Sequence, residues 1–256
     1  MIYTFGDGFA TGHIWPEWPQ LIEPILQQPL KNFGHIGAGN EYIYNCAIKS
    51  AFTATSDDLF LVQWTDCMRF DKLLEDKQWK MIQETDKVYQ GITATSFDQT
   101  WWSTSASELD EINQYKSFYI QFQQATNRTV LYMIALSKIL NSLNIKHVYF
   151  STYSFDYSTH TNYTELKELP WIDFPMGMEE WSRDHDKIRK NEIQPSPLTH
   201  LKYIIEKILP KLQIKISIKI LDEIYKLVDN YDFEPYHWDR EQIWKNLKNE
   251  ISLLCQ

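Results

Sequence analysis

The chain has 256 residues, of which 43% are hydrophobic and 23% charged, as is typical of a soluble protein with one α/β domain and a small appendage. Its formal charge of −9 argues against nucleic-acid binding, which needs a dense array of Lys and Arg side chains. No run of about 18 apolar residues is present, and the first residues lack the pattern of a signal peptide. We therefore expect no membrane association and a cytoplasmic location on synthesis.

Three cysteines are scattered along the chain and form no Cys-x-x-Cys pair. An odd number of isolated cysteines is typical of reduced thiols in a cytoplasmic protein. Zinc-type spacing of Cys and His is absent, as are the glycine-rich patterns of nucleotide-binding loops. We therefore expect no metal and no cofactor.

Apolar runs that end in turns predict three strands in the first 64 residues. The run IYTF (2–5) stops at Gly6 and predicts a buried first strand, and NFGHIGAGN (32–40) is a second strand-to-loop transition. The sequence NEYIYNCAIKSAF, which begins at Asn40, is typical of a helix. The run DDLFLVQW (57–64) is the clearest buried strand.

Residues 69–113 are polar and aromatic with weak periodicity, which indicates an insertion or lid. A long helix is predicted over 117–144, a fourth strand over 145–152 and an amphipathic helix over 197–212.

The last 44 residues predict a C-terminal extension, 213–256, packed on a core domain of residues 1–212. Residues 212–220 alternate like a strand, although the isoleucines and Leu227 also fit a helical stripe, and 239–254 is typical of a helix.

Strands that alternate with helices predict a three-layer, doubly wound, mostly parallel sheet with helices on both faces. In such a sheet, ligands bind beyond the carboxyl ends of the strands. The segments Gly6–Gly8, Gly37–Asn40 and Trp64–Asp66 all lie at those ends, so we expect them to converge on one cleft.

Taken in order, four segments resemble the sequence blocks of the SGNH/GDSL hydrolase superfamily, particularly the divergent versions found in tailed bacteriophages. FGDGFATG is similar to the Gly-Asp-Ser block, and NFGHIGAGN to the block whose glycine N–H helps to form the oxyanion hole. LFLVQWTD lies where Gly-x-Asn-Asp would follow a strand, and NEIQPSPLTHLKYI is similar to the Asp-x-x-His-Pro block. The resemblance covers residues 1–212 without the insertion and implies the flavodoxin-like, SGNH-type fold.

Every member of the family's catalytic triad is replaced in this chain. The nucleophilic serine corresponds to Gly8, the aspartate to Asn191 and the histidine to Gln194. The oxyanion-hole asparagine corresponds to Thr65, whereas the oxyanion-hole glycine is matched by Gly37. Loss of such a triad removes a factor on the order of 10⁶ in rate, so the resemblance implies a scaffold without the family's chemistry.

Several residues near the predicted cleft are binding candidates, each with a structural alternative. Asp7 either caps the turn or acts as a catalytic carboxylate. His13 or His35 either acts as a general base or packs near the cleft. Arg69 binds an acidic group or pairs with a neighbouring aspartate, either Asp66 or Asp71. Asn40 and the tryptophans Trp101 and Trp102 complete the set, the tryptophans stacking on sugar rings or forming a core of the insertion.

We therefore expect a catalytically inactive SGNH-like domain that serves as a binding or structural module. The phage-type resemblance implies a virion component with other protein subunits as partners, and the cleft could hold a carbohydrate. The alternative is a divergent esterase or glycan deacetylase that uses non-standard residues. A His–carboxylate pair in a concave pocket would favour the enzyme, and exposed aromatic side chains clustered away from the strand ends would favour assembly.

Overall fold

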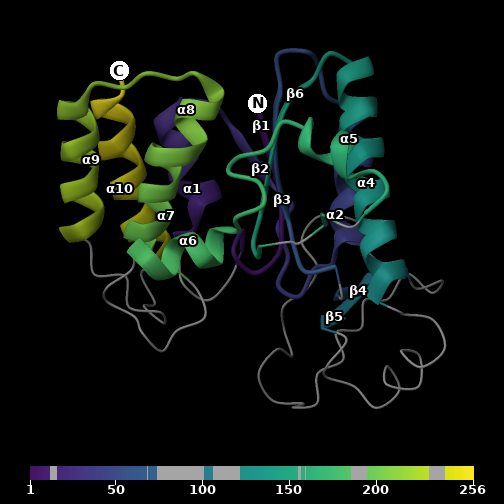
Figure 1. Ribbon diagram of the computed structural model, residues 1–256. Coiled ribbons are helices and arrows are strands. Elements are labelled where there is room, and N and C mark those ends of the chain that lie inside the picture. Colours follow the sequence, from purple (N-terminus) through teal and green to yellow (C-terminus); the bar gives the residue numbers. More distant parts are fainter. Residues whose placement is uncertain are drawn as a thin grey trace.

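The computed structural model describes residues 1–11, 16–67, 69–73, 101–105, 122–154, 157–158, 160–185, 195–230 and 240–256. The described residues form an α/β protein with a four-stranded sheet in which every strand pair is parallel (Figure 1). The strand order is β2-β1-β3-β6, and the strands are β2 (Leu30–Asn32), β1 (Ile2–Phe5), β3 (Leu59–Trp64) and β6 (Lys146–Ser151). This order is compatible with a flavodoxin-like fold.

The central strands are apolar on both sides because helices cover both faces of the sheet. Every residue of β3 is buried. Leu59 and Leu61 point into one hydrophobic cluster, and Phe60 and Val62 point into the other. This continuous apolar run is the signature of a parallel strand that lies between two helical layers.

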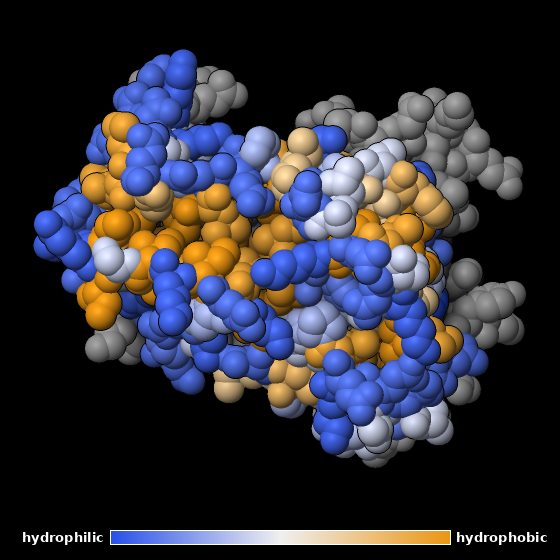
Figure 2. Space-filling model, turned by 90° about the horizontal axis from the view of Figure 1, so that it is seen from above, coloured by the Kyte–Doolittle hydropathy of each residue, from blue (hydrophilic) through white to orange (hydrophobic). Residues whose placement is uncertain are grey.

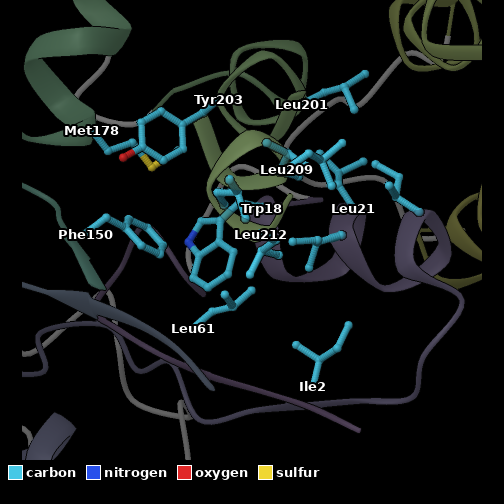
Figure 3. Close-up of a cluster of buried hydrophobic side chains, with 14 of the residues drawn as sticks. Ile2, Trp18, Leu21, Leu61, Phe150, Met178, Leu201, Tyr203, Leu209 and Leu212 are labelled. Atoms are coloured by element: carbon cyan, nitrogen blue, oxygen red, sulfur yellow. The ribbon is translucent and has the colours of Figure 1, made fainter. Parts of the chain in front are cut away.

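One face of the sheet is covered by α1 (Trp18–Leu26) and by most helices of the C-terminal half of the chain. Trp18 lies at the centre of this cluster, where its ring packs edge-on against Phe150 at 5.0 Å between centroids (Figure 3). The other helices on this face are α6 (Met178–His185), α7 (Pro197–Tyr203), the π-helix η1 (Ile204–Ile208), α8 (Leu209–Leu212), α9 (Ile218–Asn230) and α10 (Arg240–Leu254).

The opposite face is covered by α2 (Asn40–Ala51) and α4 (Phe122–Ser142), with the short α5 (Tyr163–Lys167) beside them. The rings of Tyr44 on α2 and Tyr132 on α4 stack at 4.7 Å. Together the two faces make three layers, helices on sheet on helices (Figure 1).

A separate antiparallel pair, β4 (Arg69–Leu73) and β5 (Trp101–Ser105), lies near the carboxyl ends of the parallel strands (Figure 1). These two strands fall at the start and near the end of the segment that the sequence predicts as an insertion. Strand β4 also contacts α2, and two of its side chains enter the candidate site described below.

The predicted α/β class with a parallel sheet is confirmed, and β1, β3 and β6 lie where the apolar runs place them. In the ambiguous segment 212–220, Gln213 takes a left-handed conformation (φ 61°) that ends α8, and α9 begins at Ile218. Helices α9 and α10 pack on α1 and α7, while the division of the chain at residue 212 stays a prediction. No helix among the described residues combines the length and apolarity needed to cross a membrane.

Candidate functional site

The turn after β1 is organised by the carboxylate of Asp7, which is completely buried. Its Oδ1 accepts a hydrogen bond from the backbone N–H of Phe9 (3.0 Å), and its backbone carbonyl accepts one from Ala10 N (2.9 Å). Gly8 lies within this turn and is also buried. The nucleophile position of the resemblance is therefore an enclosed turn that has no side chain.

Asp7 also joins the ends of two further strands. The hydroxyl of Thr65, directly after β3, donates to Asp7 Oδ2 at 2.6 Å, and the hydroxyl of Thr152, directly after β6, donates to Asp7 Oδ1 at 3.0 Å. Three parallel strands therefore meet at one carboxylate. A buried carboxylate needs such donors because it has lost its hydration.

The charge of Asp7 is balanced by Arg69, the first residue of β4. Arg69 Nη1 lies 3.2 Å from Asp7 Oδ2 and donates to the carbonyl of Ala38 at 3.2 Å. Arg69 Nη2 donates to the hydroxyl of Tyr153 at 3.5 Å. The ion pair is almost completely shielded from solvent, because 18% of the Arg69 side chain and none of the Asp7 side chain is exposed.

The surroundings keep Arg69 charged. Burial by itself would lower the pKa of the guanidinium, but the Asp7 carboxylate and Tyr153 outweigh it and raise the pKa. Of the neighbouring aspartates that the sequence offered as partners, Asp66 contributes only a weaker electrostatic attraction and Asp71 accepts from the start of α2. The partner is Asp7, 62 positions away in the chain, because the end of β1 lies beside the start of β4.

Asn40, the first residue of α2, is bonded to the end of β3. Its Oδ1 accepts from Thr65 N (2.9 Å), and its Nδ2 donates to the carbonyl of Thr65 (2.9 Å) and to the hydroxyl of Thr129 (3.2 Å). Both ends of the Asn40 amide are therefore engaged within the protein. The side chain fixes α2 against β3.

Asp71 anchors β4 to the beginning of α2. Its two carboxylate oxygens accept from the backbone N–H groups of Gly39 (2.8 Å) and Tyr42 (2.9 Å), which the first turn of a helix cannot pair by itself. A Cβ atom at position 39 would lie 2.5 Å from Asp71 Oδ2, so the glycine makes this close approach feasible. Sequence reasoning did not identify Asp71 as a helix-capping residue.

The loop after β2 carries two of the predicted residues. Gly37 has a φ of 80°, a left-handed conformation that favours glycine. His35 is 2% exposed, its Nδ1 lies 2.7 Å from the carbonyl of Ile36, and its ring is 5.8 Å from that of Tyr42. Burial lowers the pKa of His35 from its usual 6.5 to about 4, so the buried imidazole is neutral at physiological pH and a weak base.

The structure brings together Asp7, Thr65, Asn40 and Arg69 among the predicted residues. Trp101 and Trp102 lie on β5, where their backbones pair with Leu73 and Lys72. Three predicted residues lie outside the described residues: His13, Asn191 and Gln194. Sequence reasoning missed Thr152 and Tyr153, although their position directly after a predicted strand was the available signal.

Among the described residues near these strand ends, the two cysteines and Thr65 are poorly suited to act as nucleophiles. Burial raises the pKa of the Cys67 thiol, and burial likewise raises that of Cys46 to about 12, so neither is a thiolate near neutral pH. The hydroxyl of Thr65 donates to the same Asp7 oxygen that pairs with Arg69, which leaves that oxygen poorly placed to take a proton. Within the described part of the chain, no group of three or more His, Cys, Asp and Glu side chains could hold a metal ion.

The chain matches no protein-family model, and no curated protein matches it significantly.

Proposed function

We propose that this chain is a catalytically inactive SGNH-hydrolase-like domain that serves as a binding or structural module, with a bacteriophage virion as its assembly. The observation that carries the proposal is the closed network at the strand ends. The Asp7 carboxylate is saturated by one backbone N–H, two threonine hydroxyls and Arg69, and the position beside it is Gly8.

Acyl transfer needs a nucleophile, a base that activates it and donors for the oxyanion. Gly8 supplies no side-chain hydroxyl, and Gln194 and Asn191 cannot replace a histidine and its orienting carboxylate. The Asn40 amide, a donor candidate, is held by Thr65 and Thr129. The groups present therefore support a structural role for this edge of the sheet.

The alternative is a divergent esterase or glycan deacetylase that uses Asp7, His13 or His35. Its described candidates do not favour it. Asp7 is engaged by an arginine, and His35 is almost fully buried with a pKa of about 4. A general base works best with a pKa near the operating pH.

The test is hydrolysis of p-nitrophenyl acetate and of an acetylated glycan by the wild type and by the triple variant Gly8→Ser/Asn191→Asp/Gln194→His. The single variant Gly8→Ser is the matched control, because it adds the nucleophile without its base. We expect the wild type and the control to match the buffer rate and the triple variant to exceed it.

Turnover by the wild type well above buffer would contradict the inactive assignment, and His13→Ala and His35→Ala would then locate the base. If the triple variant does not exceed the buffer rate either, the wild type is still inactive, but support for the SGNH-type alignment of Gly8, Asn191 and Gln194 is lost.

A further inference from the structure

Helices α9 and α10 form an open groove of about 460 Å³ on the side of the molecule remote from the sheet. The groove is lined by three leucines, Leu227 on α9 and Leu253 and Leu254 on α10, and by four polar side chains, Glu223, Lys226, Asn230 and Glu250. Leu253 is 67% exposed, so much of the apolar lining is in contact with water.

The groove uses a second face of α9. Its lining positions 223, 226, 227 and 230 are spaced i, i+3, i+4 and i+7, which is one face of a helix. Ile224 and Val228 are turned to the other side and are buried in the core. Helix α9 therefore packs on its own domain with one face and presents another face, partly apolar, to solvent.

Other apolar side chains are exposed on the same side of the molecule as the groove. Figure 2 shows hydrophobic side chains gathered over the left part of the molecule, the side on which α9 and α10 lie in Figure 1. Ile218, the first residue of α9, is 78% exposed. Contiguous exposed apolar surface on a folded domain marks an interaction site.

We propose that a second copy of this chain covers the groove, with the two α9 helices packed antiparallel across a two-fold axis. Glu223 and Lys226 lie three residues apart on the groove face of α9. An antiparallel two-fold arrangement centred between residues 224 and 225 places Glu223 of each copy opposite Lys226 of the other. Neither side chain forms an ion pair with another described residue.

The same surface therefore complements itself, which is the requirement of a two-fold dimer interface. The leucines supply the apolar contact, and the four α9 and α10 helices of two copies make an antiparallel bundle. A lining with two glutamates and one lysine does not suit an anionic lipid surface, which attracts clusters of Lys and Arg. The inference rests on the assembly role proposed above, but its test measures molecular mass and not hydrolysis, so the two fail separately.

The test is the molar mass of the full chain in solution, measured by light scattering and sedimentation over a range of concentrations. The wild type is expected to reach twice the 30.5 kDa of a single chain. Leu253→Glu is expected to weaken dimerisation by roughly 100-fold, because it places a charge in the apolar contact. Phe52→Ser is the matched control, since Phe52 is 78% exposed on the opposite face of the sheet, and it is expected to leave the mass unchanged.

A charge exchange tests the two-fold geometry with surface residues whose substitution leaves the core intact. Glu223→Lys and Lys226→Glu each place like charges opposite one another in both copies and are expected to raise the dissociation constant by about tenfold. The double variant restores the opposite charges and is expected to return to within about threefold of the wild type. The proposal would be overturned by a monomeric mass at every concentration, or by a dimer whose dissociation constant is unchanged by Leu253→Glu and by the charge exchange.

Discussion

Replacement of Asp7 by Asn tests the network at the strand ends, because it removes the charge and keeps the shape of the side chain. The remaining oxygen can still accept from Phe9 N and Thr152, which approach Oδ1. The new amide N–H₂ takes the place of Oδ2, where Thr65 donates at 2.6 Å and Arg69 lies at 3.2 Å. The guanidinium of Arg69 then faces another N–H donor, and the Thr65 hydroxyl can no longer donate at this position.

The magnitude follows from the burial of the pair. Removal of one partner of a fully buried ion pair costs about 3–5 kcal/mol, since the other charge stays buried without compensation. Arg69 is 18% exposed and retains its bonds to Ala38 and Tyr153, so we expect about 3 kcal/mol, at the lower end of that range. Thr65 adds little to this figure, because its hydroxyl can rotate and accept a hydrogen bond from the new amide.

The assay is urea denaturation followed by tryptophan fluorescence, for Asp7→Asn, Arg69→Gln and the double variant. If the pair acts as described, the double variant is more stable than the sum of the single losses allows, with a coupling of about 2 kcal/mol. Asp57→Asn, the same change at an exposed position outside the network, is the control. A loss below about 1 kcal/mol for Asp7→Asn, or additive single losses, would refute the assignment of Asp7 and Arg69 as a structural pair.

Two further predictions concern His35 and Gly39. The folded-state pKa of His35, about 4, lies below the 6.5 of an unfolded histidine, so the unfolded chain binds the proton more tightly. The free energy of unfolding therefore falls as the pH is lowered from about 6.5 to about 4, by up to about 1.4 kcal/mol per pH unit, and His35→Gln should flatten that part of a urea-derived stability profile. An unchanged slope would contradict the buried neutral imidazole. Gly39→Ala should lower the free energy of unfolding by about 1–3 kcal/mol, because its Cβ meets Asp71 Oδ2 at 2.5 Å. The same change should lower it much less in an Asp71→Ala background. Equal losses in both backgrounds would show that the clash is not with Asp71.

The strands were the part of the fold most accessible to sequence reasoning. A parallel strand between two helical layers is apolar along its whole length, so IYTF and LFLVQW stand out without alignment. The segment 212–220 was ambiguous, because alternate isoleucines satisfy a period of two while every fourth one satisfies a helix. Packing decided between them, since Ile224 and Val228 on the continuation of that stripe are buried against the core.

Only the part of the candidate site that follows from the order and direction of the strands could be predicted from the sequence. The strand-end rule placed Asp7, Thr65 and Asn40 together, because the ends of adjacent parallel strands share one edge of the sheet. The partner of Arg69 could not be read in the same way. Asp66 and Asp71 are close in sequence, but Asp71 is committed to the start of α2, and only the placement of β4 across the strand ends brings Arg69 to Asp7.

The two surfaces discussed above differ in what they can offer a partner. At the strand ends, a ligand would have to displace hydrogen bonds of 2.6–3.2 Å among groups that are already paired, so little free energy is left for binding. At the α9–α10 groove, a partner would remove exposed leucine surface from water. Association is therefore expected at the helices that cover one face of the sheet, away from the strand ends that hold Gly8.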